Sequence, residues 1–490
     1  MGSVGVAMKV FGRVLNDVVS FFVFSALDLL DVLLCMVYKL ADYAFESEWK
    51  PCYCSSSSAG DRITGGGNIL VSERGGPSRV VCLCNSKIQL EDISDTLFDR
   101  PSLVSDVCKS TAEELKRLKS SSSSSSLSSS SGKKSQFVLQ KSRPALRSSA
   151  VTINSTIVEM LQGKIGRLKS TPIPRWSDCD CTTCTSWSSS SSKETLFVHA
   201  EGAKENVKED VLFIHGFISS SKFWTETVFE NFREETKRDY RLIAVDLLGF
   251  GRSPKPADSL YTLREHLDMI ERSVLEPYNV KSFHIVAHSL GCILALAIAV
   301  KYPNSIKSLT LLAPPYFPVP KGEMGTQFVL RRVAPRRVWP LIAFGASVAG
   351  WYEHISRTIC LVICKNHRIW DFFAKQITRH RVKTFLIEGF MCHTHNAAWH
   401  TLHNIICGSA DKIGGYLDTV NEQLTCDVTV FHGRDDELLP VECSEAVRSK
   451  ISRAHLKVVE NKDHITIVVG RQKAFARELE EIWNNSSENN

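Results

Sequence analysis

Short apolar runs recur along the second half of the chain, and most of them end in a polar or glycine-containing turn. Such runs predict buried strands, here at residues 195–199, 211–214, 240–245, 283–288, 309–313, 427–432 and 455–459. Helical patterns lie between most of them, such as the amphipathic residues 262–277. Strands that alternate with helices predict an α/β fold with a doubly wound, mostly parallel sheet, which binds ligands at the carboxyl ends of its strands.

One interval between strands is much longer than the others. About a hundred residues, 316–425, separate the strand at 309–313 from the strand at 427–432, which is too long for a simple crossover. Their pattern is largely helical. We therefore predict a helical cap at 316–425, inserted into a body formed by residues 195–315 and 426–484.

The first 46 residues predict one long helix. Its apolar run at 18–38 is long enough to cross a bilayer, and Lys9 and Arg13 precede it. Asp28 and Asp31 oppose a simple spanning helix, because each costs ~2.5–3.5 kcal/mol at a bilayer centre.

At 100° per residue the polar positions of this helix fall in one stripe about 100° wide, with Phe21 and Phe24 as exceptions. The stripe contains Arg13, Asp17, Ser20, Asp28, Asp31, Cys35, Lys39, Asp42 and Glu46. The helix is then an uncleaved signal-anchor, a helix lying in the membrane interface, or a helix docked on the protein itself. We favour membrane or secretory targeting for residues 1–54, and Cys52 and Cys54 lie where S-acylation is possible.

Residues 55–194 form an accessory segment with serine-rich linkers at 120–131 and 188–192. We expect a small hairpin from strands at 68–72 and 79–84, and helices at 105–119 and 152–168. Asn154 begins a glycosylation sequon that matters if the chain enters the secretory pathway.

Composition narrows the classes of function. The net charge of +6, spread over 59 basic and 53 acidic residues, gives no basic stripe, so we expect no nucleic-acid partner. Sixteen cysteines in 490 residues are too few and too scattered for a disulfide scaffold.

Two groups of residues are possible metal ligands. Cys179, Cys181 and Cys184 form the densest cysteine cluster, but zinc needs a fourth ligand at a matching spacing. We interpret them as a local disulfide, an acylated group or a structural group. Four cap histidines also have no common ligand spacing and are interpreted as surface or polar-core residues: His393, His395, His400 and His403. No metal is therefore expected.

The strand at 283–288 leads into a turn of small residues and then into the helical residues 293–300. The turn follows the pattern G-x-S-x-G, with Ala287 in the first place, Ser289 in the middle and Gly291 last. Such a nucleophile elbow lifts the serine hydroxyl clear of the sheet edge. We therefore predict that Ser289 is a nucleophile, with His288 as an accessory residue beside it.

Later strands carry the partners that a nucleophilic serine needs. Asp435 and Asp436 follow the strand at 427–432, and His464 follows the strand at 455–459, in the order Ser, acid, His.

The strand at 211–214 ends at His215 and Gly216, which we expect near the site. The backbone NH groups of Phe217 and Leu290 are then the expected oxyanion hole.

These motifs resemble the serine α/β-hydrolase superfamily over residues 195–484. More narrowly, the N-terminal helix and residues 175–181 and 392–408 resemble the plant BODYGUARD family, so the resemblance covers nearly the whole chain. The Gly-x-x-Asp-x-x-x-Pro pattern of the superfamily, with Gly433 and Pro440, selects Asp436 as the acid.

The resemblance implies a lysophospholipase-like serine acyl hydrolase of long-chain lipid esters, linked to cutin and cuticle formation. It further implies the secretory pathway, with the protein at the cell membrane or in the extracellular wall, and no cofactor. Cap aromatics are candidates for lining an acyl-chain tunnel, although core packing is the expected role of most: Phe328, Trp339, Phe344, Trp351 and Phe390. Two alternatives stay open, a polyester-forming acyltransferase and a non-catalytic ligand receptor on the same fold.

Overall fold

The structure is a computed structural model that describes residues 2–46, 68–71, 79–82, 176–182, 184–185, 195–204, 207–256, 259–377 and 384–488. The chain divides into one unit of residues 1–52 and 172–490 and another of residues 53–171. In the second unit β1 (Asn68–Val71) pairs antiparallel with β2 (Arg79–Cys82), which confirms the predicted hairpin. Some predictions lie outside the described residues, namely the helices at 105–119 and 152–168, the serine-rich linkers at 120–131 and 188–192, the Asn154 sequon, and S-acylation of Cys52 and Cys54.

A seven-stranded sheet forms the centre of the first unit, in the order β3-β5-β4-β6-β7-β8-β9. All neighbours are parallel except the edge strand β3, which is antiparallel to β5. The strands are β3 (Val198–Gly202), β4 (Glu209–Ile214), β5 (Tyr240–Val245), β6 (Phe283–His288), β7 (Ile306–Leu312), β8 (Asp427–Gly433) and β9 (His455–Val459). The predicted α/β fold with a mostly parallel sheet is confirmed.

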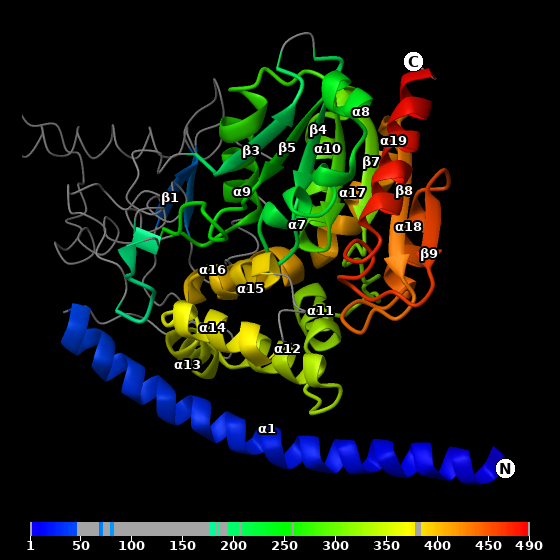
Figure 1. Cartoon of the computed structure of the whole chain (residues 1–490). Helices are drawn as coiled ribbons and strands as arrows, with labels where there is room; N and C mark the ends of the chain where they lie inside the picture. Colours follow the sequence, from blue (N-terminus) through cyan, green and yellow to red (C-terminus); the bar gives the residue numbers. More distant parts are fainter. Residues whose placement is uncertain are drawn as a thin grey trace, which may run out of the picture. The chain divides into compact units, whose positions relative to one another are not determined.

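Helices cover both faces of the sheet (Figure 1). They are α7 (Lys222–Thr225), α8 (Glu234–Asp239), α9 (Leu263–Ile270), α10 (Leu290–Lys301), α18 (Glu442–Lys450) and α19 (Gln472–Glu488), with short turns η1 (Phe229–Asn231), η2 (Glu271–Leu275) and η3 (Pro303–Ser305). A capping box of Thr262 and Glu265 fixes the start of α9. The predicted helix at 262–277 continues past Ile270 as the π-helical turn η2.

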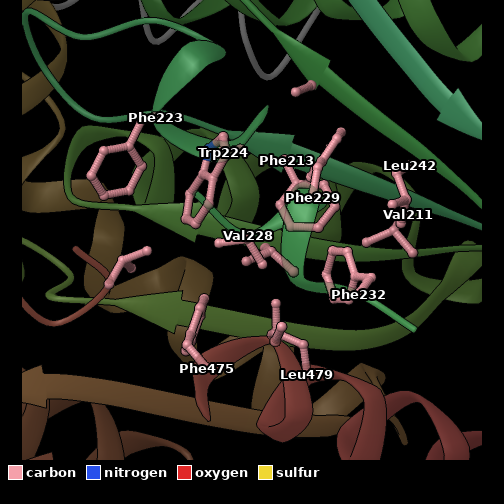
Figure 2. Close-up of a cluster of buried hydrophobic side chains, with 14 of the residues drawn as sticks. Val211, Phe213, Phe223, Trp224, Val228, Phe229, Phe232, Leu242, Phe475 and Leu479 are labelled. Atoms are coloured by element: carbon pink, nitrogen blue, oxygen red, sulfur yellow. The ribbon is translucent and has the colours of Figure 1, made fainter. Parts of the chain in front are cut away.

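The centre of the sheet is buried on both faces. Every residue of β6 is buried, and residues 290–299 of α10 are buried all around the helix, as expected for a central parallel strand and the helix that follows it. On the other face, Phe213 and Phe229 lie 4.8 Å apart between ring centroids, and Phe475 and Leu479 of α19 pack below them (Figure 2). This core holds the strand ends that carry the candidate site.

The insertion between β7 and β8 is helical, as predicted. Its elements are α11 (Gly325–Val333), α12 (Leu341–Trp351), α13 (Glu353–Val362), α14 (His367–Ile377), α15 (Thr384–Met391), α16 (His395–Thr401), the π-helical turn η4 (Leu402–Cys407) and α17 (Ala410–Gln423). The last of them, α17, packs against α10 and α18 of the body.

The N-terminal helix α1 (Gly2–Glu46) lies along the cap through its polar stripe (Figure 1). Asp31 Oδ1 accepts the backbone NH groups of His354 and Ile355, both at 2.9 Å, so a residue of α1 caps the positive end of α13. Asp42 accepts two hydrogen bonds from Arg357, at 2.6 and 2.7 Å, and both side chains are only 7% exposed.

The apolar face of α1 points away from these contacts. Its exposed side chains include Phe21, Phe22, Val32, Met36 and Phe45, which are 61–71% exposed. Residues 14–45 are long and apolar enough to cross a membrane, with a mean hydropathy of 2.2 and 17% of the most apolar window buried. The docked form, one of the three interpretations from sequence, is therefore the one in the structure.

Candidate active site

Ser289 lies at the sharp turn between β6 and α10. Its backbone has φ 53° and ψ −119°, a strained conformation for a residue with a Cβ atom, and its NH donates to Leu312 O at 2.8 Å. A Cβ atom on Gly291 would lie 2.7 Å from Ile214 O, so only glycine lets the helix pass this close to β4. The predicted elbow is present.

Asp436 and His464 lie together beyond the ends of β8 and β9. His464 Nδ1 lies 2.7 Å from Asp436 Oδ2, and the Asp436 side chain is completely buried. The other oxygen of Asp436 accepts the NH groups of Leu438 and Leu439, both at 2.9 Å. Burial alone would raise the pKa of the Asp436 carboxyl, but these hydrogen bonds and the nearby imidazole outweigh it and lower the pKa.

The two adjacent acids differ in environment. Asp435 is exposed, and its backbone NH donates to Lys462 O at 2.9 Å. Of the two acids, Asp436 is the one whose side chain contacts His464. The structure thus brings together the pair Asp436 and His464 that the sequence pattern selected.

A neutral histidine supports the acid from β8. His432 Nε2 donates to Leu439 O at 2.9 Å, so its Nδ1 accepts the Ser444 hydroxyl at 2.6 Å. Burial lowers the pKa of His432 and keeps the ring uncharged, 3.6 Å from Asp436. Sequence reasoning missed this residue.

His288 connects the elbow with the loop of His464. Its Nε2 donates to the backbone carbonyl of His464 at 2.9 Å, and Phe223 stacks on its ring at 5.0 Å. Burial lowers the pKa of His288 to about 3, so the ring is neutral at physiological pH. The accessory role expected for His288 is therefore that of a positioning residue between β6 and the His464 loop.

The predicted oxyanion-hole segment approaches Ser289 closely. A Cβ atom on Gly216 would lie 3.2 Å from the Cβ of Ser289 and 2.8 Å from His288 Nδ1, so this position has no space for a side chain. Phe217 follows directly, and Leu290 is the first residue of α10, whose NH has no partner inside the helix.

His215 and Asp246 hold the neighbouring loops. His215 Nε2 accepts the Leu247 NH at 2.9 Å and Nδ1 donates to Gly216 O at 2.7 Å, while burial lowers the pKa of the ring. Asp246 accepts the NH groups of Ser221 at 2.6 Å and Arg252 at 2.7 Å. One carboxylate thus joins the loop after β4 to the loop after β5, a role that sequence reasoning did not assign.

The cap residues named from sequence have varied surroundings. Trp339 and Phe390 are exposed, whereas Phe344 and Trp351 pack around Phe24 of α1. His403 is a polar-core histidine as interpreted, bonded to Trp399 O and Gly350 O.

Two other histidines, His367 and His393, contact cysteine side chains. His393 lies against Cys360 and Cys364. Across 183 residues of sequence, His367 brings a fourth potential ligand to the cluster of Cys179, Cys181 and Cys184.

The chain is similar in sequence to several known proteins. The sequence pattern of the family described as "alpha/beta hydrolase fold" matches residues 211–470. The chain is similar to the Arabidopsis thaliana proteins named probable lysophospholipase BODYGUARD 3 (59% identical, covering 98% of each chain) and BODYGUARD 1 (56% identical, covering 97% of this chain and 98% of the relative). Among solved structures, an esterase from Exiguobacterium antarcticum is 17% identical, with a TM-score of 0.41, and the match covers 59% of this chain and 95% of the esterase.

The level of identity and the nearly complete coverage decide the assignment. Both relatives are aligned over almost their full length, so the likeness includes α1, the accessory segment and the cap as well as the hydrolase body. The chain belongs to the BODYGUARD family of α/β-hydrolases.

Proposed function

We propose that the protein is a serine ester hydrolase in which Ser289 is the nucleophile, His464 the proton carrier and Asp436 the residue that orients His464. The observation that carries the proposal is the buried contact of 2.7 Å between His464 Nδ1 and Asp436 Oδ2, beside the strained turn at Ser289. An elbow serine with a histidine and a buried carboxylate is the arrangement for acyl transfer.

The direction of proton transfer follows from the hydrogen bonds. Since Asp436 is a carboxylate with a lowered pKa, the Nδ1 atom of His464 carries the proton that is shared with it. The Nε2 atom of His464 is then left as a base for the Ser289 hydroxyl. Asp436 also stabilises the imidazolium that forms when His464 has taken the serine proton.

The developing oxyanion needs hydrogen-bond donors on the other side of the substrate carbonyl. We assign this role to the backbone NH groups of Phe217 and Leu290. Losing one such donor typically costs about 3–4 kcal/mol of transition-state stabilisation. The close packing of Gly216 against Ser289 and His288 supports the assignment, because it brings the Phe217 segment to the nucleophile.

For the substrate we propose long-chain lipid esters of the lysophospholipid or monoacylglycerol type. The BODYGUARD relatives are named probable lysophospholipases, and a Xenopus laevis protein named monoacylglycerol lipase abhd6-B is 23% identical over 57% of this chain and 77% of its own. The exposed apolar face of α1 supports the same choice, since it suits a protein that works beside lipid. A role in cutin and cuticle formation in the cell wall is part of this proposal.

We further propose that α1 lies in the plane of a membrane surface rather than across it. The helix has 45 residues and is therefore about 68 Å long, more than twice the ~30 Å hydrocarbon core. Its polar contacts with the cap extend from Asn16 to Asp42. A helix held to the cap along this length cannot cross the bilayer while the cap stays in water, whereas its outward apolar face can enter the interface.

Fluorophosphonate labelling of the full-length protein tests the nucleophile. The wild type should be labelled covalently, and Ser289→Ala should lose both labelling and esterase activity while keeping its unfolding temperature. Ser449→Ala is a matched control, since Ser449 is an exposed serine of α18 whose hydroxyl donates to Glu445 O. Full labelling of Ser289→Ala would overturn the assignment.

A chain-length series tests the substrate class. Burial of each acyl CH₂ group contributes ~0.8 kcal/mol of binding free energy. If part of this binding free energy is expressed in the transition state, the catalytic efficiency on monoacyl esters should rise several-fold from acetyl to stearoyl. A preference for acetyl esters would contradict the lipid proposal. Product analysis with added hydroxy-fatty acids distinguishes hydrolysis from polyester formation, and tight ligand binding without turnover would favour a receptor.

A further inference from the structure

Two clusters of thiols and imidazoles, both involving the cap, are not used by the hydrolytic site. We call the first the Cys3His cluster and define it as Cys179, Cys181, Cys184 and His367. We call the second the Cys2His cluster and define it as Cys360, Cys364 and His393. In each cluster all the possible ligand atoms lie within 4.8 Å of one another.

The Cys3His cluster joins two distant parts of the chain. Three cysteines come from residues 176–182 and 184–185, and His367 begins helix α14. His367 Nε2 lies 3.4 Å from Cys181 Sγ and 3.7 Å from Cys184 Sγ. The backbone NH of Cys184 points at Cys181 Sγ at 3.5 Å, the kind of contact that stabilises a metal-bound thiolate.

The Cys2His cluster lies deeper in the cap, and its three side chains are buried. Cys360 and Cys364 are four residues apart at the end of α13, which places both thiols on one side of the chain. His393 Nε2 lies 3.6 Å from Cys360 Sγ and 3.9 Å from Cys364 Sγ. His395, the first residue of α16, is also buried and would supply the fourth ligand.

These separations suit one metal ion in each cluster. With Zn–S bonds of about 2.3 Å and Zn–N bonds of about 2.0–2.1 Å, tetrahedral geometry places neighbouring ligand atoms about 3.5–3.8 Å apart. The four measured Sγ to Nε2 distances, 3.4, 3.7, 3.6 and 3.9 Å, lie around this range. A disulfide would explain only a pair of sulfurs, whereas here imidazoles and thiols surround a common point.

We propose that the protein binds two structural Zn²⁺ ions, one in the Cys3His cluster and one in the Cys2His cluster completed by His395. Sites with four protein ligands and no open position hold structure together rather than catalyse, and each thiol loses its proton on binding. The first ion ties the segment at 176–185 to α14. The second ties α13 to the chain before α16, where His393 pairs with Phe250 next to the Asp246 loop.

The sequence alone did not indicate these sites because their ligands are far apart. The short Cys-x-Cys-x-x-Cys segment was interpreted without a fourth ligand, and His367 lies 183 residues beyond Cys184. The second cluster combines residues 29 and 33 positions apart. The ligands of each cluster come together only in the folded chain.

The test is the zinc content of the full-length protein, purified in detergent without chelators and measured by inductively coupled plasma mass spectrometry. The wild type should hold two zinc ions per chain. Cys181→Ser and Cys364→Ser should each lose one, and Cys443→Ser should keep both, because Cys443 is a buried thiol of α18 outside the clusters. His367→Ala should lose one ion, whereas His367→Cys, which supplies another thiolate, should retain it.

Measurements on the wild type keep the proposal testable if the variants do not fold. Cobalt substitution should give a thiolate-to-metal charge-transfer band that zinc abolishes. Folded protein with less than half a zinc ion per chain after incubation with zinc and a reductant would overturn the proposal, as would iron in place of zinc. Disulfides among these cysteines, detected by mass spectrometry of the unreduced protein, would equally overturn it.

Discussion

Replacing Asp436 by asparagine changes one atom at the Oδ2 position that faces His464. In the wild type, Oδ1 accepts the NH groups of Leu438 and Leu439, both at 2.9 Å. The asparagine oxygen can keep both of these bonds, which turns its NH₂ group toward His464 Nδ1. A donor at this place forces the imidazole proton to Nε2, where the ring can no longer accept a proton from Ser289.

The expected loss of kcat is large because the imidazole of His464 is held in the wrong tautomer, although its position is unchanged. An equivalent change in a serine triad lowers kcat by about 10⁴-fold, which corresponds to about 5.4 kcal/mol of transition-state stabilisation. Asp435→Asn is the matched control, since Asp435 is exposed and its contact with Lys462 O uses the backbone NH. We expect Asp435→Asn to stay within about twofold of the wild type.

The assay is kcat for a p-nitrophenyl ester, together with the rate of fluorophosphonate labelling and the unfolding temperature of each variant. Asp436→Asn should lose activity and labelling rate without losing more than a few degrees of stability. Equal losses in the two variants, or an Asp436→Asn variant within tenfold of the wild type, would refute the assignment of Asp436.

Three further outcomes follow from the packing of α1 and from the buried histidines. Val32→Asp on the exposed face of α1 should weaken co-sedimentation of the protein with anionic vesicles by about tenfold or more. The control Ser449→Asp on α18 should not weaken it. If the two variants bound vesicles equally well, the in-plane placement of α1 would be contradicted. Asp42→Ala removes the carboxylate that pairs with the buried guanidinium of Arg357, so α1 should lose about 3–5 kcal/mol of protection from hydrogen exchange. Unchanged exchange would show that this ion pair is not the main contact that holds α1 on the cap. Burial lowers the pKa of His266 and of His288 from 6.5 to about 3, so between these values the unfolded chain binds protons that the folded chain does not. The free energy of unfolding should therefore decrease as the pH falls below 6.5, by up to about 1.4 kcal/mol per pH unit for each histidine, and a flat urea-denaturation profile from pH 6.5 to 4 would be inconsistent with this.

Features that depend on a short stretch of chain were predictable from the sequence. The elbow at Ser289 and the strand before it follow from a local pattern, and the structure has both. The edge strand was placed less well, at 195–199 instead of 198–202. The reason is local bonding: the NH groups of Leu196 and Phe197 donate to the Ser273 and Ser253 hydroxyls, so pairing with β5 begins later.

Features that depend on distant contacts were not predictable. The role of Asp246 could not be predicted, because its partner Ser221 lies 25 residues away and approaches only in the folded chain. The antiparallel direction of β3 has no signal in its residues. For α1 the pattern predicted one polar face, but only packing decides that this face meets the cap while the apolar face stays outside.

The contacts that dock α1 also set an order of events during synthesis. Asp28 bonds to Arg336, 308 residues later, and Asp31 bonds to His354, 323 residues later. At about 5–20 residues per second, the ribosome needs roughly 15–60 s to make this interval. For most of that time the cap does not exist, so the apolar side of α1 leaves the ribosome before its polar side has a partner. The docked form of α1 can thus arise only after the cap has been made.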